Sequence, residues 1–234
     1  MGMKHIKFLA VLLTIVGLTT LSAETKRYEV KSGIVEYTIN HSGAMMGMKM
    51  QGSGTAKTAF KEWGNVELHS EESETVTMGM KEQDKQMTKI DNGMVYTVDF
   101  DQKVIYELRI DALSNPEDKD LISTGKEALI SMGGKKIGDE KFMGYACEVW
   151  EMMKVKIWIH KGVMLKSEVD MMGIKVSTVA TKVEFDISVP DDALKLLDYP
   201  IQKGKKQQQM NEMPQMTPEQ MQQMQDMMKN FSQR

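Results

Sequence analysis

The chain has 234 residues, of which 41% are hydrophobic and 27% charged, a balance that excludes a coiled coil, a collagen or a disordered chain. Lys and Arg number 30 against 33 acidic residues, so the net charge of −3 offers no basic excess with which to bind nucleic acid. The compositional anomaly is methionine, with 24 residues.

The first 23 residues, 1–23, predict an export signal. Lys4 and Lys7 make a positive start, and an apolar run over 8–18 follows. This run is shorter than the roughly 20 residues that cross a bilayer, so we expect no stable transmembrane anchor. Leu21-Ser22-Ala23 supplies the small residues of a cleavage site, and we predict cleavage after Ala23.

Cysteine usage bears on lipid attachment and on disulfides. The residue after the predicted cleavage site is Glu24, where a lipoprotein would carry Cys, so we expect a periplasmic or secreted protein that is not lipidated. Cys147 is the single cysteine, which excludes an intramolecular disulfide. It lies in a segment that alternates like a strand, and we expect it to be a buried, small apolar residue.

Alternation of apolar and polar residues with a period of two dominates the chain. Such alternation is what a sheet with one covered face requires, and glycines or Asn-Gly pairs separate the segments as hairpin turns do. We therefore predict a mostly antiparallel meander with strands over 28–40, 44–51, 55–62, 65–70, 74–81, 94–100, 104–110, 136–142, 145–152, 155–160, 163–170 and 173–187. The alternation changes phase within the last segment, which predicts a β-bulge near Thr178.

One helix is expected between the strands. Asn115 suits the N-cap and Pro116 the first helical position, and an apolar stripe then runs to Met132. Gly133-Gly134 supplies a stop signal. The sequence thus predicts a helix over 116–132 that covers the sheet.

A short unit of methionines followed by Lys recurs at 45–50, 78–81, 152–155 and 171–176. Two interpretations compete. On the first, which periodicity alone favours, the methionines fill ordinary core positions. On the second, their flexible thioethers line an apolar cavity. On the second interpretation the ligand-lining residues are Met46, Met48, Met50, Met78, Met80, Trp150 and Trp158.

Three stretches resemble the exported half-barrel proteins of the lipoprotein-localisation (LolA/LolB-like) superfamily, especially its uncharacterised members. They are GDEKFMGYAC at 138–147, a strand–turn–strand at 155–168 and a closing segment at 183–199. The resemblance implies a curved antiparallel sheet, or half-barrel, around an apolar cavity with one or two covering helices. In carriers of this type the cavity shelters acyl chains. The resemblance covers 138–200, the upstream strand pattern is compatible with it, and we predict a half-barrel domain over 24–200.

The composition changes after Pro200, and we predict a flexible Met/Gln-rich tail over 201–234. Met210, Met213 and Met216 are spaced by three, and thioethers are soft ligands that bind Cu(I). The other interpretation of this stretch is a low-complexity linker.

A helix start over 217–220 and an apolar stripe that reaches Phe231 predict a short amphipathic helix in the tail. Such a helix would dock on the domain or on an envelope protein partner.

The sequence contains no nucleotide-binding, serine-hydrolase or zinc motif, so we predict neither an enzyme nor a cofactor. The leading function is an exported protein that binds a hydrophobic small molecule, lipid or acyl chain in an apolar cavity. The alternatives are a Met-rich envelope protein that handles copper or another metal, and an envelope interaction protein without a ligand.

Overall fold

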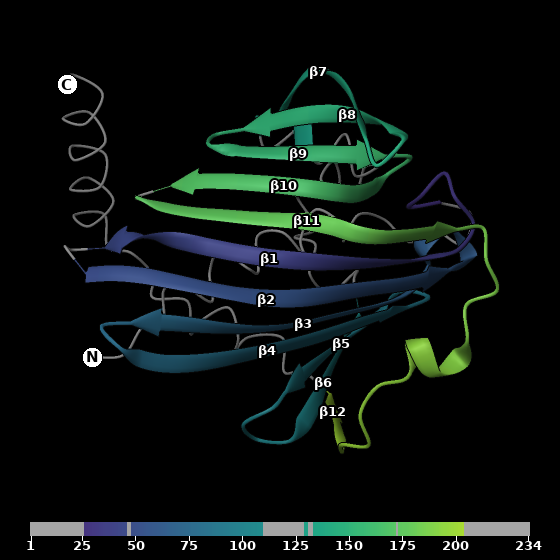
Figure 1. The fold of residues 1–234 in the computed structure, drawn as a ribbon. Coiled ribbons are helices and arrows are strands. Elements are labelled where there is room, and N and C mark those ends of the chain that lie inside the picture. The colour runs from purple at the N-terminus through teal and green to yellow at the C-terminus, as the bar shows by residue number, and fades with distance from the viewer. Residues whose placement is uncertain (1–25, 46–47, 110–128, 131–132, 172, 204–234) are drawn as a thin grey trace. The chain divides into compact units, whose positions relative to one another are not determined.

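A computed structural model describes residues 26–45, 48–109, 129–130, 133–171 and 173–203. Its main feature is one curved, unclosed antiparallel sheet of twelve strands in the order β12-β6-β5-β4-β3-β2-β1-β11-β10-β9-β8-β7 (Figure 1). The predicted fold class, a mostly β half-barrel, is confirmed. The strands are β1 (Gly33–Met45), β2 (Met48–Lys61), β3 (Val66–Thr77), β4 (Met80–Asp91), β5 (Met94–Asp99), β6 (Val104–Arg109), β7 (Lys135–Phe142), β8 (Tyr145–Met152), β9 (Val155–His160), β10 (Val163–Met171), β11 (Ile174–Phe185) and β12 (Ile201–Lys203).

The chain divides into two compact units, Met1–Gln202 and Lys203–Arg234. The first unit contains the sheet up to the second residue of β12. The predicted export signal over 1–23 and the tail beyond Lys203 lie outside the described residues, so the predicted domain boundaries stay predictions. In the part of the chain that is described, no helix is long and apolar enough to cross a membrane.

The predicted strands over 44–51 and 55–62 are wrong in their division, because β2 runs without a break from Met48 to Lys61. Likewise β3 continues through 71–73, and the predicted strand over 74–81 spans the turn at Met78-Gly79. Glycine and charged clusters indicate turns in a sequence, but here they lie within bent strands. Strand β4 was not predicted beyond residue 81, because its side chains are mostly polar and lack apolar alternation, although it pairs with β3 along its whole length.

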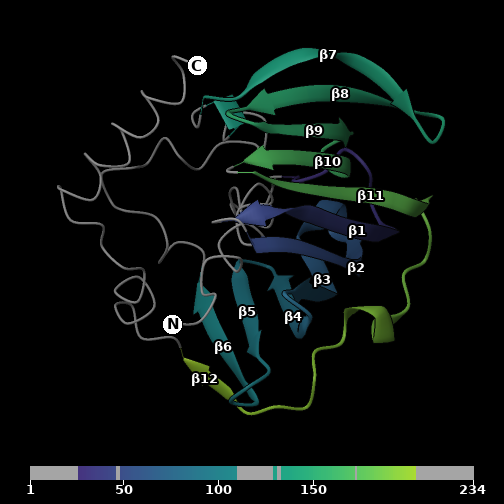
Figure 2. The ribbon, with the colours of Figure 1, turned by 60° about the vertical axis from the view of Figure 1, so that its left-hand side comes forward.

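Residues 26–32, which we call the N-terminal strap, cross one end of the sheet instead of beginning the first strand. The backbone N–H groups of Arg27 and Tyr28 donate to the Trp63 carbonyl at 3.0 Å, and that of Glu29 donates to the Lys161 carbonyl at 2.9 Å. Trp63 lies in the β2–β3 turn and Lys161 in the β9–β10 turn. In a flat sheet these turns would be about four strand spacings, or roughly 19 Å, apart. Adjacent strap residues bond to both turns, so the sheet is strongly curled at this end (Figure 2).

The strap also identifies the concave face. Tyr28 and Val30 are buried in one cluster with Val35, Tyr37 and Phe60. The side of the sheet that carries these residues is therefore the inside of the curve, which we call the concave face. The opposite, convex face is covered by the chain after β11, where Leu194 of the 3-10 helix η4 (Asp191–Leu194) joins a cluster on β1–β3.

A bulge divides β11. Its pairing with β1 shifts between Glu36 and Tyr37, which leaves Thr181 as the extra residue. The bulge predicted near Thr178 is thus present three residues further along the strand. An extra residue reverses the alternation, so Val183 and Ala180 both face inward opposite Val35 and Tyr37.

Only the end of the predicted helix over 116–132 falls within the described residues. Leu129 and Ile130 are helical. The Gly134 N–H donates to the Leu129 carbonyl at 2.6 Å, and the Gly133 N–H donates to the Ile130 carbonyl at 2.9 Å. With Gly133 at φ +84°, this is a Schellman motif, and the predicted stop at Gly133-Gly134 is confirmed.

Candidate ligand-binding face

The concave face is apolar over the strands β8–β11. Ile39 of β1 is aligned with Thr178 of β11, which is aligned with Ser167 of β10. Ser167 is aligned with Ile157 of β9, and Ile157 with Trp150 of β8. One row of side chains therefore crosses the inside of the curve. The cluster around this row is apolar, and its buried members are Leu129, Trp150, Val155, Ile157, Ile159 and Val169.

The fully buried Leu129 belongs to the preceding helix. Its side chain belongs to the same apolar cluster as Trp150 and Ile157. The end of the predicted helix therefore covers the concave face over β8–β10, as a covering helix of a half-barrel would.

The concave face is polar over β2–β4. His41 of β1 reaches across β2, and its Nε2 lies 2.7 Å from Thr75 Oγ1 on β3. Thr58 Oγ1 lies 2.9 Å from His69 Nδ1, and the other ring nitrogen of His69 lies 3.9 Å from a carboxylate oxygen of Glu71. Burial lowers the pKa of His41, although Glu71 acts in the opposite direction, so its imidazole is held neutral. This side of the face offers hydrogen bonds rather than apolar contact.

Gly52 makes the His41–Thr75 contact possible. A Cβ on Gly52 would collide with the His41 ring and with the Glu74 carbonyl. A glycine therefore lets the ring lie flat over β2 and lets β2 approach β3 closely. Gly54, two residues along the same face, meets the backbone of β3 in the same way. The two glycines thus favour a bend in β2 instead of ending it.

The strap closes one end of the concave face around a buried charge. The Arg27 guanidinium donates to the Gly64 carbonyl at 2.6 Å and lies 3.5 Å from the carboxylate of Glu67, to which the Tyr28 hydroxyl donates at 2.5 Å. Burial alone would lower the pKa of Arg27, but the Glu67 carboxylate outweighs it and raises the pKa. Burial and the same carboxylate raise the pKa of Tyr28. Both groups keep their protons, and the cluster is structural.

The methionines predicted to line a cavity lie at the opposite end from the strap. Met50 is buried and aligned with Thr77, which is aligned with Met80 on β4. Met48 lies on the same side of β2 as Met50, and Met78 lies in the β3–β4 turn. Met48, Met78 and Met80 are exposed. Met46 lies outside the described residues.

The two predicted tryptophans are both buried, but in different clusters. Trp150 packs with Leu129 on the concave face, whereas Trp158 packs with the strap-end cluster and donates its indole N–H to Glu140 at 2.7 Å. The structure therefore does not bring the methionines together with either tryptophan, and a ligand-lining role for the set stays a prediction. The buried position of Cys147 is confirmed, and burial raises the pKa of its thiol.

The residues of the copper alternative, Met210, Met213 and Met216, lie outside the described residues. Among the residues that are described, no group of three or more His, Cys, Asp or Glu side chains is placed to hold a metal ion.

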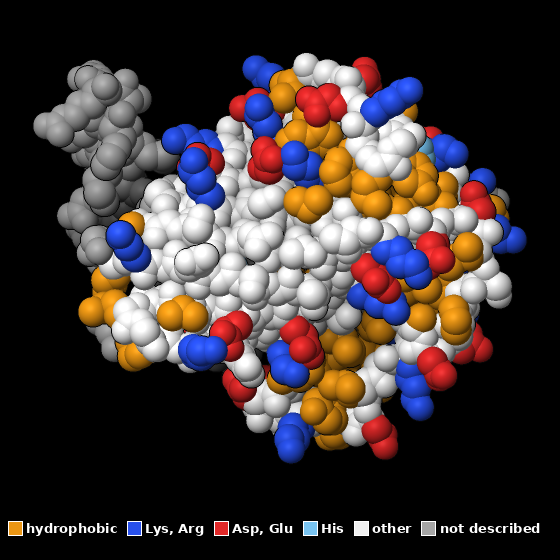
Figure 3. Space-filling view, viewed as in Figure 1, with side chains coloured by type: hydrophobic (Ala, Val, Ile, Leu, Met, Phe, Trp, Pro, Cys, Tyr) orange, Lys and Arg blue, Asp and Glu red, His pale blue; other side chains and the backbone are white. Residues whose placement is uncertain are grey.

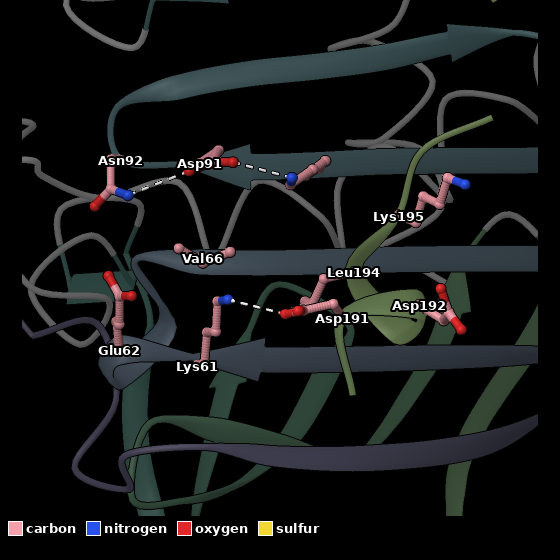
Figure 4. A pocket seen from close by; sticks show the side chains of 10 residues that line it. Lys61, Glu62, Val66, Asp91, Asn92, Asp191, Asp192, Leu194 and Lys195 are labelled. Carbon is pink, nitrogen blue, oxygen red and sulfur yellow. Dashed lines mark hydrogen bonds and ion pairs between the residues drawn. The ribbon is translucent and has the colours of Figure 1, made fainter. Parts of the chain in front are cut away.

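A depression of about 430 Å³ lies on the convex side, between η4 and the strands β2–β4 (Figure 4). Its lining is mostly charged, with ion pairs from Lys61 to Asp191 at 3.5 Å and from Lys89 to Asp91 at 2.9 Å. Such a lining does not suit an apolar ligand. Of the two pairs, Lys61–Asp191 joins η4 to the sheet, whereas Lys89 and Asp91 both lie on β4.

Sequence reasoning missed the polar half of the concave face and the strap. Gly52 and Gly54 within an otherwise strand-like segment were the available signal for a bend and a close approach. The signal for the strap was a change of phase, because Tyr28 and Val30 do not continue the alternation of Val35, Tyr37 and Ile39 in β1.

An unclosed, curved antiparallel sheet with a helix end docked on its concave face is a half-barrel. Solved structures similar to this chain include an uncharacterised conserved protein from Thermus thermophilus, with 8% identity and a TM-score of 0.38. The similarity covers 72% of this chain and 90% of the Thermus chain. A putative outer membrane lipoprotein-sorting protein domain from Vibrio parahaemolyticus is similar over 72% of this chain and 91% of its own (12% identity, TM-score 0.31). A LolA superfamily protein from Nitrosomonas europaea is similar over 80% of this chain and 97% of the Nitrosomonas chain (8% identity, TM-score 0.31). No protein-family model matches the sequence, and sequence comparison with curated proteins finds no match.

Proposed function

We propose that this protein is an exported, non-enzymatic carrier that holds an amphipathic lipid or acyl chain on its concave face. The observation that carries the proposal is the division of this face into an apolar half on β8–β11 and a polar half on β2–β4. An acyl chain would lie along the part of the apolar half that stays half-buried, beside Met171 and Val176. Its polar end would meet the hydroxyl and imidazole groups of Thr75, His41 and His69.

The geometry of the sheet supports this assignment. The strap closes one end of the curve, so a ligand would enter from the end where Met48, Met78 and Met80 lie. A neutral His41 adds hydrogen-bonding capacity without the cost of burying a charge beside an acyl chain.

Strand β11 offers a matched pair of variants for the test. Val176 faces the concave side, aligned with His41, whereas Val179 faces the convex side, aligned with Thr38. Both are half-buried. In Val176→Glu a carboxylate would lie against the acyl chain, where an unpaired charge is costly. In Val179→Glu the same charge would lie on the other face, aligned with Lys166.

The experiment is a titration of the exported chain, from Glu24 onward, with a fluorescent long-chain fatty acid. We expect the wild type and Val179→Glu to bind the probe, and Val176→Glu to bind it about tenfold or more weakly. Circular dichroism checks that both variants are folded. Equal binding by two folded variants, or no binding by the wild type, would contradict the proposal.

A further inference from the structure

Four of the hairpin turns at the end of the sheet that the strap leaves uncovered carry methionine. They are the β1–β2, β3–β4, β8–β9 and β10–β11 turns, which share one end because the strands are antiparallel (Figure 1). These turns coincide with the four recurrences of the methionine–lysine unit. We call their described residues together the methionine rim, which comprises 45, 48–49, 77–81, 152–155, 171 and 173–175.

The rim turns form a continuous row. The Ala44 N–H donates to the Gly173 carbonyl at 3.1 Å, which places the β1–β2 turn beside the β10–β11 turn. The Asp170 N–H donates to the Lys154 carbonyl at 3.0 Å, which places the β8–β9 turn next in the row. On the other side, Met50 is aligned with Thr77, so the β3–β4 turn adjoins the start of β2.

Four methionines of this row project into solvent, whereas Met152 is buried and Met171 is half-buried. Met78, Met80 and Met153 are 72%, 68% and 78% exposed, and Met48 is 38% exposed. Figure 3 shows hydrophobic side chains at the left-hand edge, where β2 and β4 begin. Met78 and Met153 also have positive φ values of 53° and 54°, a conformation that Gly or Asn adopts more readily. Neither packing nor turn geometry therefore accounts for methionine at these positions.

Each rim turn also carries one Lys and no acidic residue: Lys49, Lys81, Lys154 and Lys175. Lys81 and Lys175 pair with Glu74 and Asp170, which lie further back on the strands. Lys49 and Lys154 make no ion pair with any described residue. Exposed pairs of this kind hold their partners weakly, so the lysines are available to an anionic surface.

We propose that the methionine rim docks on an anionic lipid bilayer. Exposed apolar side chains mark contact surfaces, and a row of separate tips flanked by lysines suits insertion between headgroups better than a flat protein partner. Juxtaposed lysines add attraction to anionic lipids. The rim borders the open end of the concave face, so docking would place a ligand of the proposed carrier beside the membrane. The docking itself does not depend on that ligand.

The experiment measures flotation of the exported chain with phosphatidylcholine vesicles, with and without phosphatidylglycerol. The variant Met78→Ser/Met80→Ser/Met153→Ser removes the exposed thioethers, and Lys81→Gln/Lys154→Gln removes two charges. The control is Met143→Ser, because Met143 lies in the β7–β8 turn at the strap end with a φ of 51° and 46% exposure.

We expect the wild type and the Met143→Ser control to float with phosphatidylglycerol vesicles, and the triple methionine variant to bind them about tenfold more weakly. The lysine variant should lose the preference for phosphatidylglycerol. If the folded triple variant binds as the wild type does, or if the wild type binds neither vesicle, the rim is not a docking surface. Flotation is measured without added fatty acid, and fatty-acid binding by the wild type is measured without vesicles, so failure of docking and failure of the carrier function are distinguishable.

Discussion

His41 links the two halves of the concave face. It belongs to the apolar alternation of β1, yet its ring crosses Gly52 to the hydroxyl of Thr75. Protonation of His41 lowers the stability of the native state, because burial disfavours the imidazolium form.

This makes stability depend on pH in a known direction. The pKa of His41 is lowered in the folded state from 6.5, so the unfolded chain binds the proton more readily and the native state loses stability as the pH falls through about 6.5. Urea unfolding across this range should show a smaller loss in His41→Gln than in the wild type, because Gln does not titrate. Parallel losses in the two proteins would show that His41 does not contribute.

Gly52 gives a second test at the scale of single residues. In Gly52→Ala the new methyl group would meet the His41 ring and the β3 backbone, so we expect the free energy of unfolding to fall by about 1–3 kcal/mol. Gly138→Ala on β7 is the matched control, because a Cβ there meets nothing within 4 Å. Urea denaturation of both variants gives the comparison, and equal stabilities would mean that β2 tolerates a side chain at this bend.

Among the elements, the strap fixes the curvature, since it joins two turns that a flat sheet would hold apart. Its buried anchor is the hydrogen bond from Tyr28 to Glu67. Tyr28→Phe leaves a buried carboxylate with one donor fewer, which should cost about 1–3 kcal/mol of unfolding free energy. Hydrogen exchange should become faster at the Tyr28 and Glu29 amides. Unchanged exchange at both amides would show that the strap is held without this bond.

The helix end supplies another prediction for an element. Leu129 is fully buried against Trp150 and Ile157, so Leu129→Ala should lower the free energy of unfolding by about 2–5 kcal/mol. The exposed neighbour Ile130 is the control, and Ile130→Ala should have little effect. Thermal unfolding of the two variants measures the difference. Equal midpoints would place the helix away from the sheet.

The elements also show how much of this fold a sequence can predict. Alternation located β5–β11, and the Gly133-Gly134 stop was correct because a Schellman motif needs glycine locally. Strand β4 was missed since it lacks apolar alternation and is held by pairing with β3 along its whole length, which only the register reveals. For the same reason the polar half of the site was not predicted. His41 of β1 and Thr75 of β3 are in contact across β2, and their separation in the sequence does not predict that contact.

For the whole molecule, the tail distinguishes the carrier function from copper handling. A chain ending at Lys206 lacks Met210, Met213 and Met216 but keeps β12. We expect this truncated chain to unfold at the same urea concentration and to bind the fatty acid as the full chain does. Titration of both chains with Cu(I) under reducing conditions should show equal, negligible binding. If the tail is flexible, as its sequence predicts, ordering it opposes coordination by about 1–2 kcal/mol per residue. Copper binding by the full chain alone would favour the metal-handling alternative.

The central claim is that the concave face carries an amphipathic lipid, and native mass spectrometry of the protein purified from its own compartment tests it most directly. The wild type and Val179→Glu should each carry a lipid adduct that is released on activation, and folded Val176→Glu should carry none. A wild type that carries no lipid, or an adduct retained equally by Val176→Glu, would contradict the account.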